Sequence, residues 1–265
     1  MTDHTSESHS LESHLRATRE KGRKLLVPYV TGGLDDEWLE VVRALAMAGA
    51  DAIEVGIPFS DPVMDGPIIQ AASVRALERG VTPESIISAL TGADIDVPIV
   101  VMTYVNLIAH AGYRRMANRL AEAGVAGAIL PDLPVDEAGE WLVESAAAGI
   151  DSVLLAAPTS SDARLELICA NCRGFVYGVG LMGVTGVRSE LSDSAKTIAR
   201  RLKAVTDLPV LIGVGVSNTE QAVEISEIAD GVVVGSALVR RLLDGEGSES
   251  AADFIGSIRE ALDKG

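Results

Sequence analysis

The sequence contains few aromatic residues, and this scarcity limits how its core can be built. Phe, Trp and Tyr make up 3% of the 265 residues, whereas hydrophobic residues as a whole make up 48%. A core must therefore be assembled mainly from Val, Ile, Leu and Ala, which suit buried parallel strands covered by helices. The length predicts a single domain over residues 1–265, with a polar, mobile tail at residues 1–10.

Cysteine is also scarce, which argues against a redox or metal site. The only two cysteines, Cys169 and Cys172, form a C-A-N-C pair in a segment with helical spacing. A redox or metal role would need a strand-to-helix setting or a second pair of ligands, and neither is present. Three of the four histidines, His4, His9 and His14, lie near the N-terminus and form no ligand cluster. We predict no metal and two reduced cysteines.

Positive charge is in deficit, with 38 acidic against 22 basic residues and a net charge of -16. This charge repels nucleic acids and anionic membranes, so we exclude both as partners. A surface this acidic also suggests a high-salt cytoplasm, because salt screens the mutual repulsion of the carboxylates. A halophilic protein of this kind should melt at a higher temperature as the KCl concentration rises. A melting temperature that does not rise with salt would contradict the hypothesis.

Long hydrophobic runs are missing, since no window approaches the roughly 18 apolar residues that a membrane span requires. The first ten residues, MTDHTSESHS, have neither the basic start nor the apolar stretch of a secretion signal. We therefore expect a cytoplasmic protein.

Short β-branched runs alternate with longer Ala-rich segments of helical spacing, which indicates repeated βα units. Eight such runs occur, the number that closes a parallel (β/α)₈ TIM barrel: 25–30, 52–57, 97–102, 126–131, 152–157, 174–179, 209–214 and 231–236. Leu11 and Leu15 predict a short N-terminal helix before the first strand. The competing fold, an open doubly wound sheet, needs a G-x-G-x-x-G loop after that strand, and residues 31–34 (TGGL) do not supply it.

Capping residues predict where several helices begin and end. Thr82, Asp136 and Asn218 are each expected to open a helix. Glycines that follow alanine are expected to end helices just before strands: Gly49, Gly124 and Gly149. The loops that follow strands then form the functional face, and they are richer in Gly, Asp, Ser and Pro than the return loops.

The most informative stretch is residues 54–67, EVGIPFSDPVMDGP. Glu54 falls within an apolar strand, where burial would raise its pKa and suit it to proton transfer. Prolines and a glycine stiffen the loop that presents Asp61 and Asp65 at the barrel mouth. Two carboxylates in different settings can take different proton roles. The competing interpretation is a salt-bridged Glu54 inside the barrel and loop acids that are merely solvated.

This stretch strongly resembles the signature of the tryptophan synthase alpha chain family, and the resemblance extends from Pro28 to Ser236. Matching segments follow the third, fourth and sixth strands: residues 102–106 (MTYVN), 131–134 (PDLP), Tyr177 and 183–186 (GVTG). The resemblance implies a carbon–carbon lyase of tryptophan biosynthesis. It would perform a retro-aldol cleavage of indole-3-glycerol phosphate to indole and glyceraldehyde 3-phosphate.

The resemblance also implies roles for the catalytic residues. Glu54 would be the general acid/base that protonates indole carbon 3 and takes the proton from the side-chain hydroxyl. Asp65 would hold the indole N–H and stabilise the positive charge of the intermediate. Tyr177 would support the substrate hydroxyl and Glu54, although a tyrosine at a strand end is also an ordinary core residue.

Substrate binding divides into a phosphate cradle, an indole pocket and a lid. Glycine-rich loops after strands six, seven and eight place backbone N–H groups where barrels commonly bind phosphate. The predicted binding residues are Gly186 after strand six, Gly215 within residues 213–215 after strand seven, and Gly235 and Ser236 after strand eight. The resemblance assigns the indole pocket to apolar side chains: Tyr29, Met102, Ile129 and Leu155. Residues 178–194 would form the lid, and Thr185 would meet Asp65 on closure. Here Gly180, Leu181 and Met182 replace the serine and arginine with which the lid commonly begins.

The family resemblance further implies a partner. Members work with a beta chain that uses pyridoxal phosphate (PLP) and receives the indole, so we expect an α₂β₂ tetramer and no cofactor in this chain. The contacting positions would lie on exposed loops: Asp61, Pro62, Asn106 and Pro134.

Two rival functions remain. Another phosphate-handling barrel of the same pathway would want a lysine at a strand end, and none of the eight runs carries one. A non-catalytic barrel that binds a phosphorylated ligand or regulates a partner is the alternative of a different class.

Overall fold

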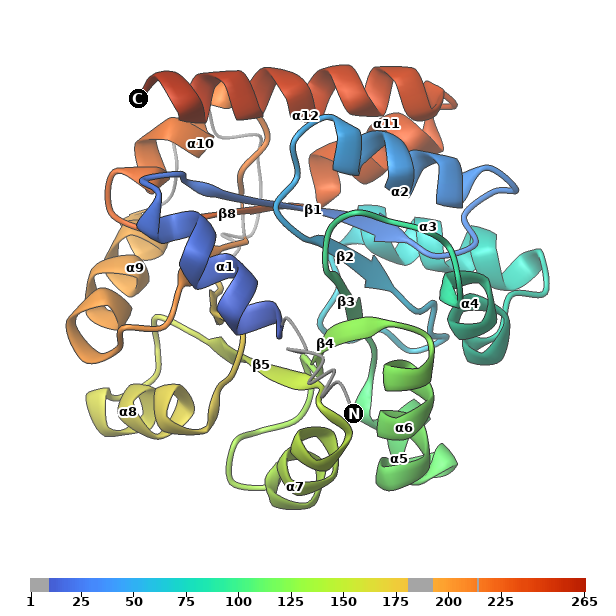
Figure 1. Ribbon diagram of the computed structural model, residues 1–265, viewed down its shortest axis with the longest axis horizontal. Helices are drawn as coiled ribbons and strands as arrows, with labels where there is room; N and C mark the ends of the chain where they lie inside the picture. Colours follow the sequence, from blue (N-terminus) through green and yellow to red (C-terminus); the bar gives the residue numbers. More distant parts are fainter. Residues whose placement is uncertain (1–9, 181–192, 214) are drawn as a thin grey trace, which may run out of the picture.

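The computed structural model describes residues 10–180, 193–213 and 215–265, and it forms a closed barrel of eight parallel strands in sequence order (Figure 1). Each strand pairs with its neighbours in the chain, and β1 also pairs with β8. The strands are β1 Leu25–Thr31, β2 Ile53–Gly56, β3 Ile99–Met102, β4 Val125–Ile129, β5 Asp151–Ala156, β6 Val176–Gly178, β7 Val210–Ile212 and β8 Gly231–Val234. The predicted barrel is confirmed, and the open doubly wound sheet is excluded.

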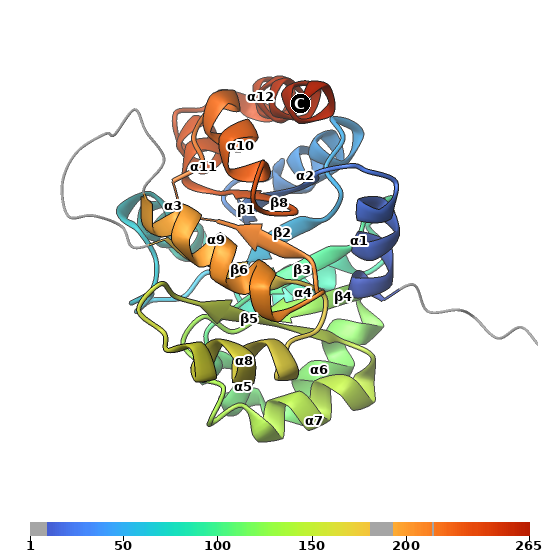
Figure 2. The same cartoon turned by 90° about the vertical axis from the view of Figure 1, so that its left-hand side faces the viewer.

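Helices surround the barrel (Figures 1 and 2). They are α1 Leu11–Glu20, α2 Trp38–Met47, α3 Pro67–Glu78, α4 Pro83–Leu90, α5 Val105–Ala111, α6 Tyr113–Glu122, α7 Gly139–Ala148, α8 Asp162–Asn171, α9 Asp193–Val205, α10 Thr219–Ser226, α11 Ser236–Leu243 and α12 Gly247–Lys264. No helix within the described part of the chain is long and apolar enough to cross a membrane.

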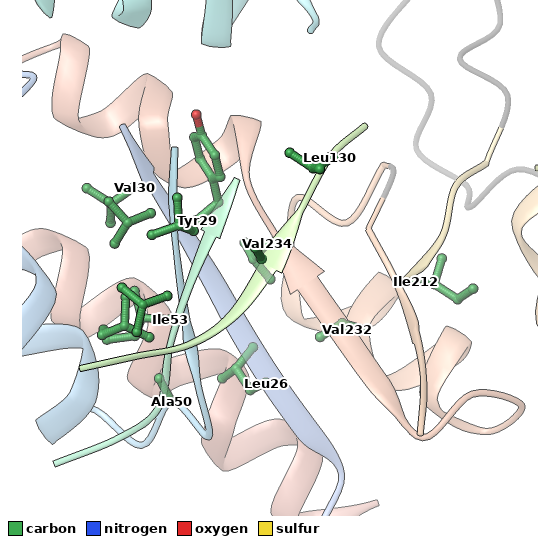
Figure 3. Packing of buried hydrophobic residues seen from close by; sticks show 14 of the residues in the cluster. Leu26, Tyr29, Val30, Ala50, Ile53, Leu130, Ile212, Val232 and Val234 are labelled. Carbon is green, nitrogen blue, oxygen red and sulfur yellow. The ribbon is translucent and has the colours of Figure 1, made fainter. Parts of the chain in front are cut away.

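Alternate strand residues divide the core into two layers. Leu25 and Val27 of β1 belong to an interior cluster, whereas Leu26 and Val30 pack with the surrounding helices. Figure 3 shows part of the outer layer, including Leu26, Val30 and Ile53. The division follows from the two-residue period of a strand, which sends neighbouring side chains to opposite faces.

Helix α1 closes the end of the barrel where the strands begin. Leu11 and Leu15 are fully buried in the interior cluster, and Figure 1 shows the helix lying across the barrel. A β-carbon at Gly127 within β4, or at Gly174 just before β6, would lie 2.8 or 2.7 Å from a methyl group of Leu11, so both glycines make room for this side chain. The predicted N-terminal helix is thus the floor of the barrel.

A buried ion pair ties the last helix to this same end. The Asp51 carboxylate accepts hydrogen bonds from the Leu26 N–H and the Arg23 guanidinium at 2.8 and 2.7 Å. Arg259 of α12 reaches the same carboxylate at 3.3 Å, and its side chain is only 6% exposed. Removing one member would leave a buried charge without its partner, which is costly.

The capping predictions hold at two of three helices. Thr82 and Asn218 cap α4 and α10 through their side chains. Asp136 does not open α7, which begins at Gly139 with Ala138 at the N-cap. A hydrogen-bonded turn from Pro134 to Glu137 precedes the helix, and Asp136 instead forms an ion pair with Arg164 of α8.

Shortening Leu11 tests whether α1 is a structural floor. Leu11→Ala should lower the free energy of unfolding by about 2–5 kcal/mol, because it leaves a cavity inside the closed barrel. Urea unfolding followed by circular dichroism measures the change. Leu167→Ala is the matched control, since Leu167 is 41% exposed and should change stability by less than about 1 kcal/mol. Equal losses in the two variants would show that α1 is not a structural floor.

Candidate active site

A cavity of about 600 Å³ opens at the end of the barrel where the strands finish. Its walls come from β1, β2, β3, β5 and β6, from the loops that follow β2, β4, β5, β6, β7 and β8, and from helices α3 and α11. It brings together residues that are far apart in the sequence and were predicted as site residues: Tyr29, Glu54, Asp65, Met102, Leu155, Tyr177, Gly215, Gly235 and Ser236.

Glu54 lies on β2 and lines this cavity, and its side chain makes no hydrogen bond or ion pair with the residues that the structure describes. Its side chain is 1% exposed, and its Oε2 atom has no hydrogen-bond partner among the described residues. Burial, and then the nearby charge of Asp65, raise the pKa of Glu54 to about 8. The carboxyl group is therefore protonated at neutral pH. The salt-bridged interpretation is wrong for the described part of the chain.

Asp65 lies in the loop between β2 and α3, held by backbone and side-chain contacts. Its N–H bonds to the Pro62 carbonyl at 3.0 Å, and its own carbonyl accepts from the Gln70 side chain at 2.8 Å. Burial raises the pKa of Asp65 to about 6, while a hydrogen bond from Tyr104 opposes the rise. Asp65 is thus ionised at pH 7, when Glu54 is not.

Tyr104 positions the loop that carries Asp65. Its hydroxyl accepts a hydrogen bond from the Met64 N–H at 3.0 Å and donates one to Asp65. The ring is stacked on Phe59 with 5.0 Å between centroids and is 3% exposed. The sequence analysis did not single out this residue, although it lies in the MTYVN segment that follows β3.

Two tyrosine rings line the cavity because glycines lie beside them. A β-carbon at Gly56 would lie 2.0 Å from the Tyr29 hydroxyl oxygen, and one at Gly213 would lie 1.9 Å from the Tyr177 ring. Neither ring could keep its place beside a larger residue. Burial raises the pKa of both phenols far above their usual range, so each remains a hydrogen-bond donor.

Two of the three predicted phosphate loops are described and meet at the cavity. Gly215 has a φ of +93°, which favours glycine, and it is exposed. Gly235 is the N-cap of α11 and Ser236 its first residue. The first N–H groups of a helix have no partner within it, and they favour anions. Gly186 lies outside the described residues.

The predicted indole-pocket residues do not all reach the cavity. Met102 and Leu155 line it together with Tyr29. Ile129 is fully buried in the interior cluster, against which Met102, Leu155 and Tyr177 pack, and it is not among the cavity-lining residues. Of the predicted lid, Gly180 lines the cavity, whereas Leu181, Met182 and Thr185 lie outside the described residues.

Of the predicted partner-facing positions, Asp61 and Pro62 lie in the loop after β2 and Pro134 in the loop after β4, whereas Asn106, expected in a loop, lies in the first turn of α5. Asp61, Asn106 and Pro134 are exposed, and Pro62 is half-buried. Beside them Val63, which the sequence analysis did not mark, is 78% exposed. The adjacent Met64 is 54% exposed, so two consecutive apolar side chains are open to solvent on this loop.

No other feature of the described residues competes with this site. A hollow of about 640 Å³ between α6 and α7 is wide open, and its Arg114 already pairs with Glu144 at 3.0 Å. No group of three His, Cys, Asp or Glu side chains in the described ranges could hold a metal ion. Cys169 and Cys172 are both buried free thiols, and burial raises the pKa of Cys172 to about 12.

Comparisons with known proteins agree with this geometry. The family model described as tryptophan synthase alpha chain matches residues 15–260. The tryptophan synthase alpha chain of Streptomyces avermitilis is 43% identical over 96% of this chain and 94% of its own length. That of Streptomyces coelicolor is 44% identical, with 96% of both chains covered.

Solved structures show the same likeness. A chain of Mycobacterium tuberculosis tryptophan synthase superposes with a TM-score of 0.87 at 39% identity, covering 95% of this chain and 97% of that one. The alpha chain from Legionella pneumophila gives the same TM-score at 31% identity, covering 96% and 97%. Family match, identity and fold lead to one conclusion: this chain belongs to the tryptophan synthase alpha chain family of lyases, whose activity is the cleavage of indole-3-glycerol phosphate.

Proposed function

We propose that Glu54 and Asp65 divide the chemistry of the retro-aldol cleavage between them. The observation that carries this proposal is the placement of two carboxyl groups in unlike settings of one cavity: Glu54 is fully buried on β2 and its Oε2 atom has no partner among the described residues, whereas Asp65 lies half-buried in the loop after β2. Burial in a low-dielectric site separates their pKa values, which is how two carboxyl groups take different proton roles.

Glu54 begins as the acid. It donates its proton to carbon 3 of the indole ring, which converts the ring to an indolenine with positive charge at nitrogen. The resulting carboxylate then takes the proton of the neighbouring side-chain hydroxyl as the carbon–carbon bond breaks. The bonding electrons return to the ring, indole and glyceraldehyde 3-phosphate form, and Glu54 is protonated again.

Asp65 acts on the other side of the ring. Its carboxylate accepts the indole N–H and offsets the charge that develops on nitrogen, which stabilises the transition state more than the ground state. Tyr177 supports the substrate hydroxyl and Glu54 through its protonated phenol. Tyr29, Met102 and Leu155 hold the ring, and the Gly215, Gly235 and Ser236 loops bind the phosphate. For Gly186, Thr185 and Ile129 the roles in phosphate binding, lid closure and the indole pocket stay predictions.

We also propose that the chain works in the cytoplasm with a beta subunit in an α₂β₂ tetramer. The partner would hold the PLP and receive the indole, and this chain would need no cofactor. The exposed Val63, which follows Asp61 and Pro62 in the chain, and the exposure of Asn106 and Pro134 support this contact surface. Sedimentation of the two chains mixed in equal amounts measures the stoichiometry, and a heterodimer mass would contradict the tetramer.

Replacing Glu54 separates catalysis from binding. Glu54→Gln should reduce indole release from indole-3-glycerol phosphate by at least about 10³-fold, because the amide can neither donate nor take the proton. Binding of glycerol 3-phosphate should change less than about threefold. Indole release is followed with and without a beta subunit. Unchanged turnover would remove the mechanism and favour the non-catalytic binding barrel.

Replacing Tyr104 tests how Asp65 stays ionised. The rate should rise through an apparent pKa near 6, as Asp65 ionises, and fall near 8, as Glu54 loses its proton. Tyr104→Phe removes a hydrogen bond that favours the carboxylate, so the pKa of Asp65 should rise and the acidic limb should move to higher pH. Tyr113→Phe, which alters a ring packed near Trp141, is the control and should leave the limb in place. An acidic limb that moves to lower pH or stays put would contradict the role of Tyr104.

A further inference from the structure

Arg240 of α11 is the one cationic side chain among the described residues that line the cavity. Three residues of this helix reach the cavity wall, Ser236, Ala237 and Arg240. Positions i, i+1 and i+4 share one face of a helix, and helical side chains lean toward the N-terminus. Arg240 therefore lies one helical turn after Ser236 on the side of α11 that faces the cavity.

The neighbouring arginine shows that this placement is specific. Arg241 points elsewhere, pairing with Glu246 at 2.9 Å and lying over the Phe254 ring at 4.6 Å. The Arg240 guanidinium makes no ion pair or hydrogen bond with any residue that the structure describes, and its side chain is exposed. Arg241 thus fastens α11 to α12, whereas Arg240 remains available to a ligand.

The charge balance of the cavity calls for a cation at this place. Asp65 is ionised near pH 7, and the whole chain carries a net charge of -16. A phosphate monoester brings a further charge of about -1.5 to -2 at this pH. A helix N-terminus offers only about half a positive charge. Backbone N–H groups can orient the phosphate, but they leave most of its charge uncompensated.

We propose that Arg240 is a binding residue for the phosphate of the substrate and makes this site select phosphorylated over neutral indole glycerol. The proposal rests on the proposed function, since it assumes that the phosphate lies at the Gly235–Ser236 end of α11. Arg240 offers a full charge and several N–H donors to the phosphate oxygens. The backbone fixes where the phosphate lies, and Arg240 determines how much its charge contributes to affinity.

The test compares Arg240→Gln with Arg241→Gln in the full-length chain. For Arg240→Gln we expect the dissociation constant of glycerol 3-phosphate and the KM of indole-3-glycerol phosphate to rise about tenfold, the scale of one charge-assisted contact. The kcat should stay within about twofold, and the affinity for unphosphorylated indole glycerol should not change. The tenfold difference should shrink in 1 M KCl, where charges are screened within about 3 Å. Arg240→Lys keeps the charge and should fall between wild type and Arg240→Gln.

The controls separate this inference from the function on which it rests. Arg241→Gln should lower the melting temperature through its lost contacts but leave both constants unchanged. If wild type neither binds glycerol 3-phosphate nor cleaves the substrate, the proposed function fails. If wild type does both and Arg240→Gln binds equally well, only the role of Arg240 fails. An equal loss of affinity for the unphosphorylated analogue would likewise overturn it.

Discussion

A carboxyl group inside an aliphatic barrel must find a cation or keep its proton, and Glu54 finds no cation among the described residues. Its position is therefore unfavourable for stability and useful for chemistry. Among the described residues no positive charge and no hydrogen bond lowers its pKa, and burial and the charge of Asp65 both raise it. Glu54 lines the cavity, and a ligand bound there is the partner that we propose for its free oxygen.

The rest of the site follows from keeping this one group protonated. A second carboxylate can help only if it stays ionised close by, and its charge in turn raises the pKa of Glu54 further. Tyr104 makes this arrangement possible because it is fixed by Phe59 on one side and by the Met64 N–H on the other. The fixed Tyr104 hydroxyl favours the ionised form of Asp65 without adding a positive charge to the cavity. A positive charge there would have lowered the pKa of Glu54 and removed its proton.

Local patterns predicted the strands, the order of the barrel and a carboxyl group at Glu54 within an apolar strand, because each depends on a short stretch of sequence. The choice of Asp65 over Asp61 depended on the family resemblance, since both are acids of the same loop. The prediction that Asp136 caps a helix was wrong. Aspartate is a common capping residue, but its presence does not reveal the hydrogen-bonded turn from Pro134 to Glu137, which places Asp136 before the start of α7. The hydrogen bond from Met64 to Tyr104 joins residues 40 positions apart, and such pairings cannot be read from a single segment. Gly213 was predicted as part of a phosphate loop. The structure shows that it must also lack a side chain, because a β-carbon there would collide with the ring of Tyr177 on β6.

The contacts of helix α1 limit how early the barrel can close while the chain is being synthesised. Helix α1 is the first helix of the described chain, yet its partners come much later in the sequence. The Glu12 N–H bonds to Asp151, the Glu12 carboxylate accepts from Gly174, and Arg16 pairs with Asp207. These contacts cannot form until residue 207 has been synthesised, and closure of β1 on β8 needs residue 231. Most of the chain must therefore exist before the barrel can be sealed, a topology of high contact order in which folding is slow.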